Sequence, residues 1–228
     1  MTPNHHLPGE ILLDYAAGGM AEPMALVVAT HLTLCPECRA AVGRLEAVGG
    51  ALLDRLEPTP VAEGGLEAVL ARLDEPAPPV RTAGVDHRPG HRLGDLMLPE
   101  PLRSYLARDL LTRGDDLKAL PWHRLARGIE EHEIALGDAA ARTALIKAKG
   151  GSALPWHTHG GLELTLVLSG GFADGARHFG RGDIDVADAG INHRPVADPG
   201  EDCLCLAYAE AKPRLTGPLA WIWSWFVR

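Results

Sequence analysis

Residues 31–38 read His-Leu-Thr-Leu-Cys-Pro-Glu-Cys, and this short stretch restricts the folds open to the first third of the chain. On a helix, His31 and Cys35 are four residues apart and therefore lie on the same face, one turn above each other. Pro36 is unfavourable inside a helix but suits the first turn of a new one. We therefore expect one helix to end at Cys35 and another to begin there, with Cys38 in its first turn.

A closed structural zinc site has four ligands, and this corner supplies three. His5 and His6 precede the first predicted helix, and either imidazole could be the fourth ligand. The alternative is that both cysteines are small buried side chains and that His31 is an ordinary hydrogen-bonded histidine. The in-register histidine and the His5-His6 pair favour a Zn²⁺ site.

Apolar residues at helical spacing predict four helices within residues 1–75, and Tyr15 is the only aromatic residue among them. The predicted helices cover about residues 11–16, 22–34, 36–56 and 66–73. Gly49-Gly50 is expected to bend or break the third one. Because such a module has a thin core, we expect it to need a metal or a partner for stability.

The chain has 228 residues and a formal net charge of −8, and the charge is unevenly distributed. Residues 1–75 carry four arginines against eleven carboxylates, a formal charge of −7, so the remainder carries −1. An acidic module argues against direct nucleic-acid binding and suits a basic protein partner, although acidity for solubility explains it equally well. The sequence contains neither an apolar run of membrane-spanning length nor a signal peptide pattern, which predicts a cytoplasmic protein with no membrane contact.

The pattern of apolar residues changes after residue 75, from helical spacing to a Pro- and Gly-rich stretch and then to short alternating runs. Residues 76–92 contain four prolines and two glycines and are expected to be a flexible linker. Residues 96–111 are weakly helical or irregular by pattern. From Trp122 onward, short apolar alternations separated by Gly, Asp and Pro turns predict a small antiparallel sandwich or barrel. The predicted organisation is a helical domain at 1–75, a linker at 76–92 and a β domain at 93–228.

A second cluster of potential ligands lies in the β region. His157 and His159 are two residues apart, so on a strand both side chains point the same way. Glu163 follows on or beside the next strand, and His193 must come from a later one. Three imidazoles and a carboxylate could bind Zn, Mn, Fe, Ni or Cu, and their identity alone does not select the metal.

The spacing of these ligands resembles the motifs of the cupin family. Residues 151–170 match its first motif, G-x5-H-x-H-x3-E-x6-G, at every fixed position. The second motif, G-x5-P-x-G-x2-H-x3-N, is matched at Gly182, Gly190 and the following histidine, but Asp188 replaces Pro and Ala197 replaces Asn. The resemblance implies a metal-binding double-stranded β-helix, or jelly roll, and the two departures concern the turns more than the ligands.

A zinc-binding helical module followed by a cupin resembles the ChrR-type anti-sigma factors. The resemblance implies a multidomain α and β fold, with a four-helix zinc anti-sigma domain before a cupin sensor. It implies an inhibitor that binds an extracytoplasmic-function-type sigma factor in a one-to-one complex, releases it after an oxidative signal such as singlet oxygen or organic hydroperoxide, and is compatible with a homodimer when free. The metal ligands it implies are His6, His31, Cys35 and Cys38 in the first domain and His157, His159, Glu163 and His193 in the second.

Three candidates for the oxidant-sensing site follow from the sequence. Cys203 and Cys205 would face the same side of one strand, where buried apolar cysteines are the more frequent case. The thiolates of the predicted zinc site are the second candidate. The cupin metal site is the third and is favoured, so replacing Cys203 and Cys205 with Ser should leave release largely intact.

The rival function is a cupin metalloenzyme of the dioxygenase type, with the helical module as a zinc-stabilised docking or dimerisation element. A redox-inactive zinc in the cupin favours the sensor, and an accessible iron, copper or manganese favours the enzyme. For the regulator, residues 1–85 alone are expected to bind and inhibit the sigma factor. The three tryptophans in residues 221–226 are expected to share one strand face and to pack on the barrel.

Overall fold

The computed structural model describes residues 2–73, 75, 92–93, 96–113, 117, 120–136 and 141–216. The expected linker at 76–92 lies almost entirely outside the described residues, as do the tryptophans of the C-terminal segment. The helices are α1 (Gly9–Ala16), α2 (Glu22–Leu34), α3 (Pro36–Leu53), α4 (Gly65–Ala71) and α5 (Glu100–Arg113). The strands are β1 (Arg92–Leu93), β2 (Leu96–Met97), β3 (His123–Ala126), β4 (Ile129–Glu133), β5 (Arg142–Ala148), β6 (His157–Thr158), β7 (Glu163–Ser169), β8 (Gly171–Asp174), β9 (Arg177–Gly180), β10 (Ile184–Ala187), β11 (Asn192–His193), β12 (Val196–Ala197), β13 (Cys203–Ala209) and β14 (Arg214–Leu215).

The strands form an antiparallel sandwich, as the alternating pattern predicts. Its largest sheet has the order β10-β7-β13-β5-β4-β3, and two three-stranded sheets have the orders β11-β6-β14 and β12-β8-β9. Side chains alternate across the large sheet with the strand period of two. On β13, Leu204, Leu206 and Tyr208 belong to the hydrophobic cluster shared with the helices, whereas Cys203 and Cys205 belong to a second, smaller cluster.

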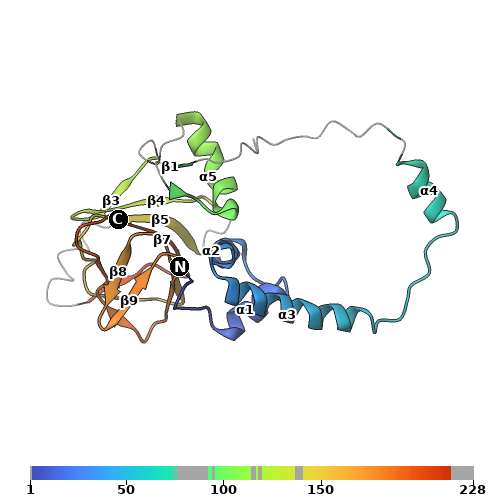
Figure 1. Cartoon of the computed structure of the whole chain (residues 1–228), viewed down its shortest axis with the longest axis horizontal. Coiled ribbons are helices and arrows are strands. Elements are labelled where there is room, and N and C mark those ends of the chain that lie inside the picture. The colour runs from blue at the N-terminus through green and yellow to red at the C-terminus, as the bar shows by residue number, and fades with distance from the viewer. Residues whose placement is uncertain are drawn as a thin grey trace.

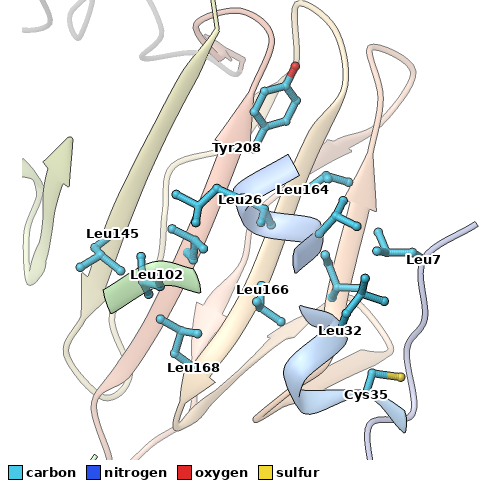
Figure 2. Packing of buried hydrophobic residues seen from close by; sticks show 14 of the residues in the cluster. Leu7, Leu26, Leu32, Cys35, Leu102, Leu145, Leu164, Leu166, Leu168 and Tyr208 are labelled. Carbon is cyan, nitrogen blue, oxygen red and sulfur yellow. The ribbon is translucent and has the colours of Figure 1, made fainter. Parts of the chain in front are cut away.

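The helices of the N-terminal segment pack directly on this sheet. Helix α2 is buried on several faces, because it contacts α5 on one side and strands β5, β7 and β13 on another. Figure 2 shows Leu26 and Leu32 of α2 over the strand that carries Leu164 and Leu166, and Leu102 of α5 beside Leu145. The core of the helical segment is therefore continuous with that of the sandwich, and the thin independent core expected from the sequence is not observed.

The four helices expected in residues 1–75 are all present, but they do not form one compact module. Helix α4 has no buried residue and stands away from the other elements (Figure 1). Helix α3 continues through Gly49 and Gly50 to Leu53, so the expected interruption there is wrong. Residues 96–111 were expected to be weakly helical or irregular, and most of them form the 14-residue helix α5, as the first alternative predicts. Its buried Leu102 and Leu106 stabilise this helix, because tertiary packing outweighs weak local propensity.

No single described helix is long and apolar enough to cross a membrane. Helices α2 and α3 reach that length and composition only when taken together, and the pair is bent by 116° at the break between them.

Candidate metal centres

The first cluster of ligands lies at the corner between α2 and α3. Cys35 is both the C-cap of α2 and the N-cap of α3, with φ −111° and ψ 101°, and Pro36 begins α3. The backbone N–H of Cys38 donates to the Cys35 Sγ at 3.4 Å. Both thiols are buried, at 0% and 2% exposure, so the corner predicted from the sequence brings the two sulfur atoms together.

The structure distinguishes the two N-terminal histidines. The Nδ1 atom of His6 lies 3.2 Å from the Cys35 Sγ and 3.7 Å from the Cys38 Sγ, and its Nε2 faces the Glu37 carboxylate at 3.3 Å. His5 points elsewhere, because its Nε2 lies 3.0 Å from the carbonyl of His178. Of the two candidates, the structure therefore places His6 in the cluster.

His31 completes this group from the last turn of α2. Its Nδ1 lies 3.0 Å from the Gly182 carbonyl. A carbonyl only accepts, so Nδ1 carries the proton and Nε2 presents a bare lone pair. Among the described residues, that buried Nε2 has no hydrogen-bond partner. The four ligand atoms all lie within 4.8 Å of one another, and nitrogen and sulfur ligands of a tetrahedral zinc would be about 3.5 Å apart. The donor set fits a zinc ion.

Burial favours the uncharged forms of His31 and Cys38 in the metal-free protein. It lowers the pKa of His31 from 6.5 to about 4, against the opposing hydrogen bond to Gly182. Burial also raises the pKa of the Cys38 thiol to about 11. A neutral imidazole is the ligand form, whereas the thiol must lose its proton on binding, so metal binding here would release protons.

The second cluster is assembled from strands of two sheets. His157 begins β6, His193 ends β11, and the antiparallel pairing of these strands places the two residues directly opposite each other. His159 follows β6, and Glu163 is the first residue of β7. The three histidines are buried, and their ligand atoms and that of Glu163 lie within 4.8 Å of one another.

The tautomers of the three histidines would suit a cation between them. Each Nδ1 faces an oxygen acceptor: the Pro155 carbonyl at 2.9 Å for His157, and carboxylates at 3.0 Å for both His159 and His193. In the neutral rings the three Nε2 atoms are therefore unprotonated. Yet the His193 Nε2 lies 3.0 Å from that of His159 and 3.1 Å from that of His157. Nitrogen ligands of one metal ion would be about 3.0–3.4 Å apart, so this arrangement fits a metal ion.

Glu163 has two roles in this cluster: it accepts a hydrogen bond from His159, and it is itself a candidate metal ligand. Its Oε2 accepts from the His159 Nδ1, and this hydrogen bond is the largest cause of the raised pKa of His159. Its Oε1 accepts from the Thr165 hydroxyl at 3.4 Å. The residue thus orients one ligand and lies within reach of the same metal position.

A group of charged residues lies behind His193 and was not predicted from the sequence. The Asp174 Oδ2 accepts from the His193 Nδ1 at 3.0 Å, and Arg177 bridges Asp174 and Asp185 at 3.0 and 3.1 Å. Burial alone would raise the pKa of Asp174, but His193 and Arg177 together lower it. Burial raises the pKa of Asp185. These residues lack a recognisable spacing. The pairing of β8 with β9 places Asp174 opposite Arg177, whereas Asp185 comes from β10 and His193 from β11.

Two hollows adjoin His193. A small cavity of about 60 Å³ inside the sandwich is lined by Glu163, His193, Cys203 and Cys205. An outer hollow of about 340 Å³ is lined by Trp156, Ile191, Arg194 and again His193. The sulfur atoms of the two cysteines are 3.5 Å apart, which confirms that both face the same side of β13. His193 therefore separates an open surface hollow from the interior.

Comparison with known proteins places these features in a family. Residues 114–212 match the family described as the ChrR Cupin-like domain, so the sandwich is a cupin-like domain. Over 219 residues the chain is 43% identical to the anti-sigma-E factor ChrR of Cereibacter sphaeroides, which covers 94% of this chain and 93% of that protein. The chain therefore belongs to the ChrR family of anti-sigma factors.

A solved structure agrees with this assignment. The crystal structure of Rhodobacter sphaeroides SigE in complex with the anti-sigma ChrR matches with a TM-score of 0.71 and 40% identity, covering 90% of this chain and 98% of that one. The related protein is an anti-sigma factor and not an enzyme, and a cupin fold does not by itself imply catalysis. The predicted resemblance is confirmed, and the dioxygenase alternative loses its support.

Proposed function

We propose that this chain binds an extracytoplasmic-function-type sigma factor in a one-to-one complex and holds it inactive in the cytoplasm. The observation that carries the proposal is the 43% identity, over 94% of this chain, to an anti-sigma factor. The matching crystal structure holds a related chain in complex with SigE. The four cysteines are free thiols, which is consistent with a reducing compartment.

Exposed apolar side chains on two separate parts of the N-terminal segment support the binding role. Large hydrophobic side chains along the second half of α3 and through α4 are exposed by half or more, and soluble proteins rarely expose so many such side chains without a partner. These side chains, together called the exposed surface of α3 and α4, are Val48, Leu52, Leu53, Leu56, Val61, Leu66, Val69, Leu70 and Leu73. Amphipathic helices bind grooves through such residues, and the charge of −7 on residues 1–75 suits a basic partner.

The proposal assigns a metal to each cluster. His6, His31, Cys35 and Cys38 would hold a structural Zn²⁺ that fixes the corner between α2 and α3. His157, His159, Glu163 and His193 would hold Zn²⁺ or another divalent ion such as Mn, Fe, Ni or Cu. Bound there, the ion supplies a Lewis-acid centre beside the outer hollow.

We further propose that the cupin centre, rather than the cysteine pair, receives the oxidative signal. His193 lines the outer hollow and is therefore within reach of a small molecule from solvent. Cys203 and Cys205 are buried, and their mutual hydrogen bond and burial raise the pKa of Cys205 well above its ordinary value. A protonated, buried thiol reacts slowly with oxidants, because the thiolate is the reactive form.

The binding role is tested by replacing Leu66 and Leu70 together with Glu. Neither residue is buried, so the fold should persist while sigma binding weakens by at least about tenfold, because buried apolar contacts dominate interface affinity. The matched control is Ile191→Glu, which changes an exposed apolar residue on the cupin-like domain and should leave binding unchanged. The measurements are the affinity for the cognate sigma factor and inhibition of transcription in a purified system. Wild-type affinity in the double variant would contradict the assigned surface, and a wild-type chain that does not bind would contradict the function.

A further inference from the structure

The N-terminal cluster is contacted by a turn that belongs to the cupin-like domain. This turn, residues 180–183, joins β9 to β10. The Asp183 Oδ1 accepts the backbone N–H groups of Asn4 and His5, at 2.5 and 2.9 Å, and its Oδ2 accepts the N–H of Gly180 at 2.8 Å. Asp183 is only 4% exposed, so its carboxylate fixes the peptide immediately before His6.

The neighbouring glycine contacts the second histidine of the same cluster. The Gly182 carbonyl is the acceptor that fixes the tautomer of His31. Gly182 has φ +91°, a conformation that favours glycine, and a Cβ there would lie 2.9 Å from the Pro3 Cγ and 3.5 Å from the Leu34 Cβ. The absence of a side chain therefore allows the N-terminal segment and the end of α2 to approach this turn closely.

We propose that residues 180–183 form the outer coordination shell of the N-terminal metal centre, with Gly182 and Asp183 as positioning residues for His31 and His6. The inference rests on the metal site of the proposed function. A ligating imidazole needs its second ring nitrogen hydrogen-bonded so that the first points at the metal, and Gly182 supplies that partner to His31. The helical segment therefore does not contain its complete metal site, because part of the site lies about 150 positions later in the chain.

The same turn is connected to the cupin centre through β9. Arg177 at the start of that strand contacts Asp174, the carboxylate that orients His193. The Arg177 guanidinium also lies 5.2 Å from the ring centroid of Phe179, and that ring lies 4.3 Å from the ring of His5. A continuous set of contacts thus joins a ligand of the cupin centre to the residue beside His6.

The test uses the full-length chain and Co²⁺ as the probe. Cobalt bound by thiolates gives a sulfur-to-metal charge-transfer band, and of the two ligand clusters only the N-terminal one contains thiols. Every chain in this test also carries Cys203→Ser and Cys205→Ser, which removes the other two thiols, so the band reports the N-terminal site alone. In Asp183→Ala the apparent Co²⁺ affinity of the thiolate site should fall by about 10–100-fold, the usual effect of losing an outer-shell partner. The matched control is Asp202→Ala, which removes a carboxylate that accepts the N–H of Gly150 elsewhere in the same domain. It should leave the Co²⁺ affinity unchanged.

Each outcome of this experiment is informative. If Asp183→Ala does not fold, as judged by circular dichroism, Asp183→Asn replaces it, since it keeps the side-chain shape and loses one acceptor. A folded variant with wild-type Co²⁺ affinity would overturn the inference, even if its melting temperature fell, because a purely structural contact does not alter the thiolate site. A wild-type chain with no charge-transfer band would instead overturn the metal site of the proposed function. The two failures are therefore distinguishable.

Discussion

Asp174 is the carboxylate that orients His193 in the candidate metal centre of the cupin-like domain. It is 9% exposed in its side chain and accepts the Nδ1–H of His193, which directs the Nε2 lone pair toward the other two histidines. We expect Asp174→Asn to lower the metal affinity of the cupin centre by about 10–100-fold, because the carboxylate fixes the tautomer and increases the basicity of the ligand. The measurement is the metal content of the purified chain after dialysis against graded chelator.

The chain offers a matched control for this change. His178 and Asp198 form a similar pair, with 2.7 Å between the His178 Nε2 and the Asp198 Oδ2, but neither residue belongs to a ligand cluster. Asp198→Asn should therefore leave the metal content unchanged. Equal metal retention in the two variants would show that Asp174 does not support the centre.

His31 should make the stability of the metal-free protein depend on pH. Burial lowers its pKa from 6.5 to about 4, so between these values the unfolded chain binds a proton that the folded chain does not. The contribution of His31 to the free energy of unfolding is therefore fully present above pH 6.5, and it is lost as the pH falls toward 4. Between pH 7 and pH 5 the free energy of unfolding should fall by about 2 kcal/mol from this residue.

This pH effect is separated from those of other groups by comparison with a variant. Urea unfolding of chelator-treated wild type and of His31→Gln at both pH values isolates the contribution of His31, and the variant should show the smaller decrease. Replacement of the exposed His178 with Gln should leave the wild-type decrease in place. An identical pH dependence for wild type and His31→Gln would contradict the prediction.

Among the secondary-structure elements, α3 runs without interruption through the adjacent glycines Gly49 and Gly50. A Cβ added at Gly49 or Gly50 would meet no atom within 4 Å, and both residues are exposed. Alanine at each position should stabilise the helix by about 1 kcal/mol, which slows local amide hydrogen exchange in the last turns of α3 about fivefold per substitution. Gly18→Ala is the opposing control, since Gly18 has φ +72° and alanine there is strained. Unchanged exchange in Gly49→Ala and Gly50→Ala would contradict this expectation.

The sequence predicted those features that depend on residues close together along the chain. Pro36 and the two cysteines predicted the corner between α2 and α3, and the spacing of His157, His159 and Glu163 predicted their convergence. Other features depend on parts of the chain that only the fold brings together. Gly49 and Gly50 do not interrupt α3, although adjacent glycines predicted a bend or a break there.

The partners of the ligands depend on tertiary contacts in the same way. Gly182 and Asp183 show no local sign that they contact His31 and the segment before His6. The same holds for α5, whose periodicity is weak but whose Leu102 and Leu106 are buried against the rest of the core. Spacing along the sequence could therefore identify the candidate ligands that the fold brings together, but not the residues that orient them.

Across the whole molecule, the shared core constrains what the helical segment can do alone. Leu26, Val27, Val28 and Leu32 of α2 are buried in one cluster with residues of β7 and β13. Each such side chain contributes about 1.5–3 kcal/mol by burial, so four together approach the stability of an entire small domain. A fragment of residues 1–85 would expose this face, and it would also lack the outer-shell turn at residues 180–183.

We therefore expect the free fragment to self-associate, to bind a hydrophobic dye and to lose zinc to chelators more readily than the full chain. Light scattering after size exclusion, dye fluorescence and chelator competition measure these properties. Leu26→Gln and Leu32→Gln in the fragment should restore a monomer without restoring zinc retention, since they remove the exposed apolar face and not the missing turn. The cognate sigma factor should still bind the fragment, because the exposed surface of α3 and α4 is intact in it. A monomeric wild-type fragment that holds zinc as firmly as the full chain would show that the N-terminal segment is an independent domain.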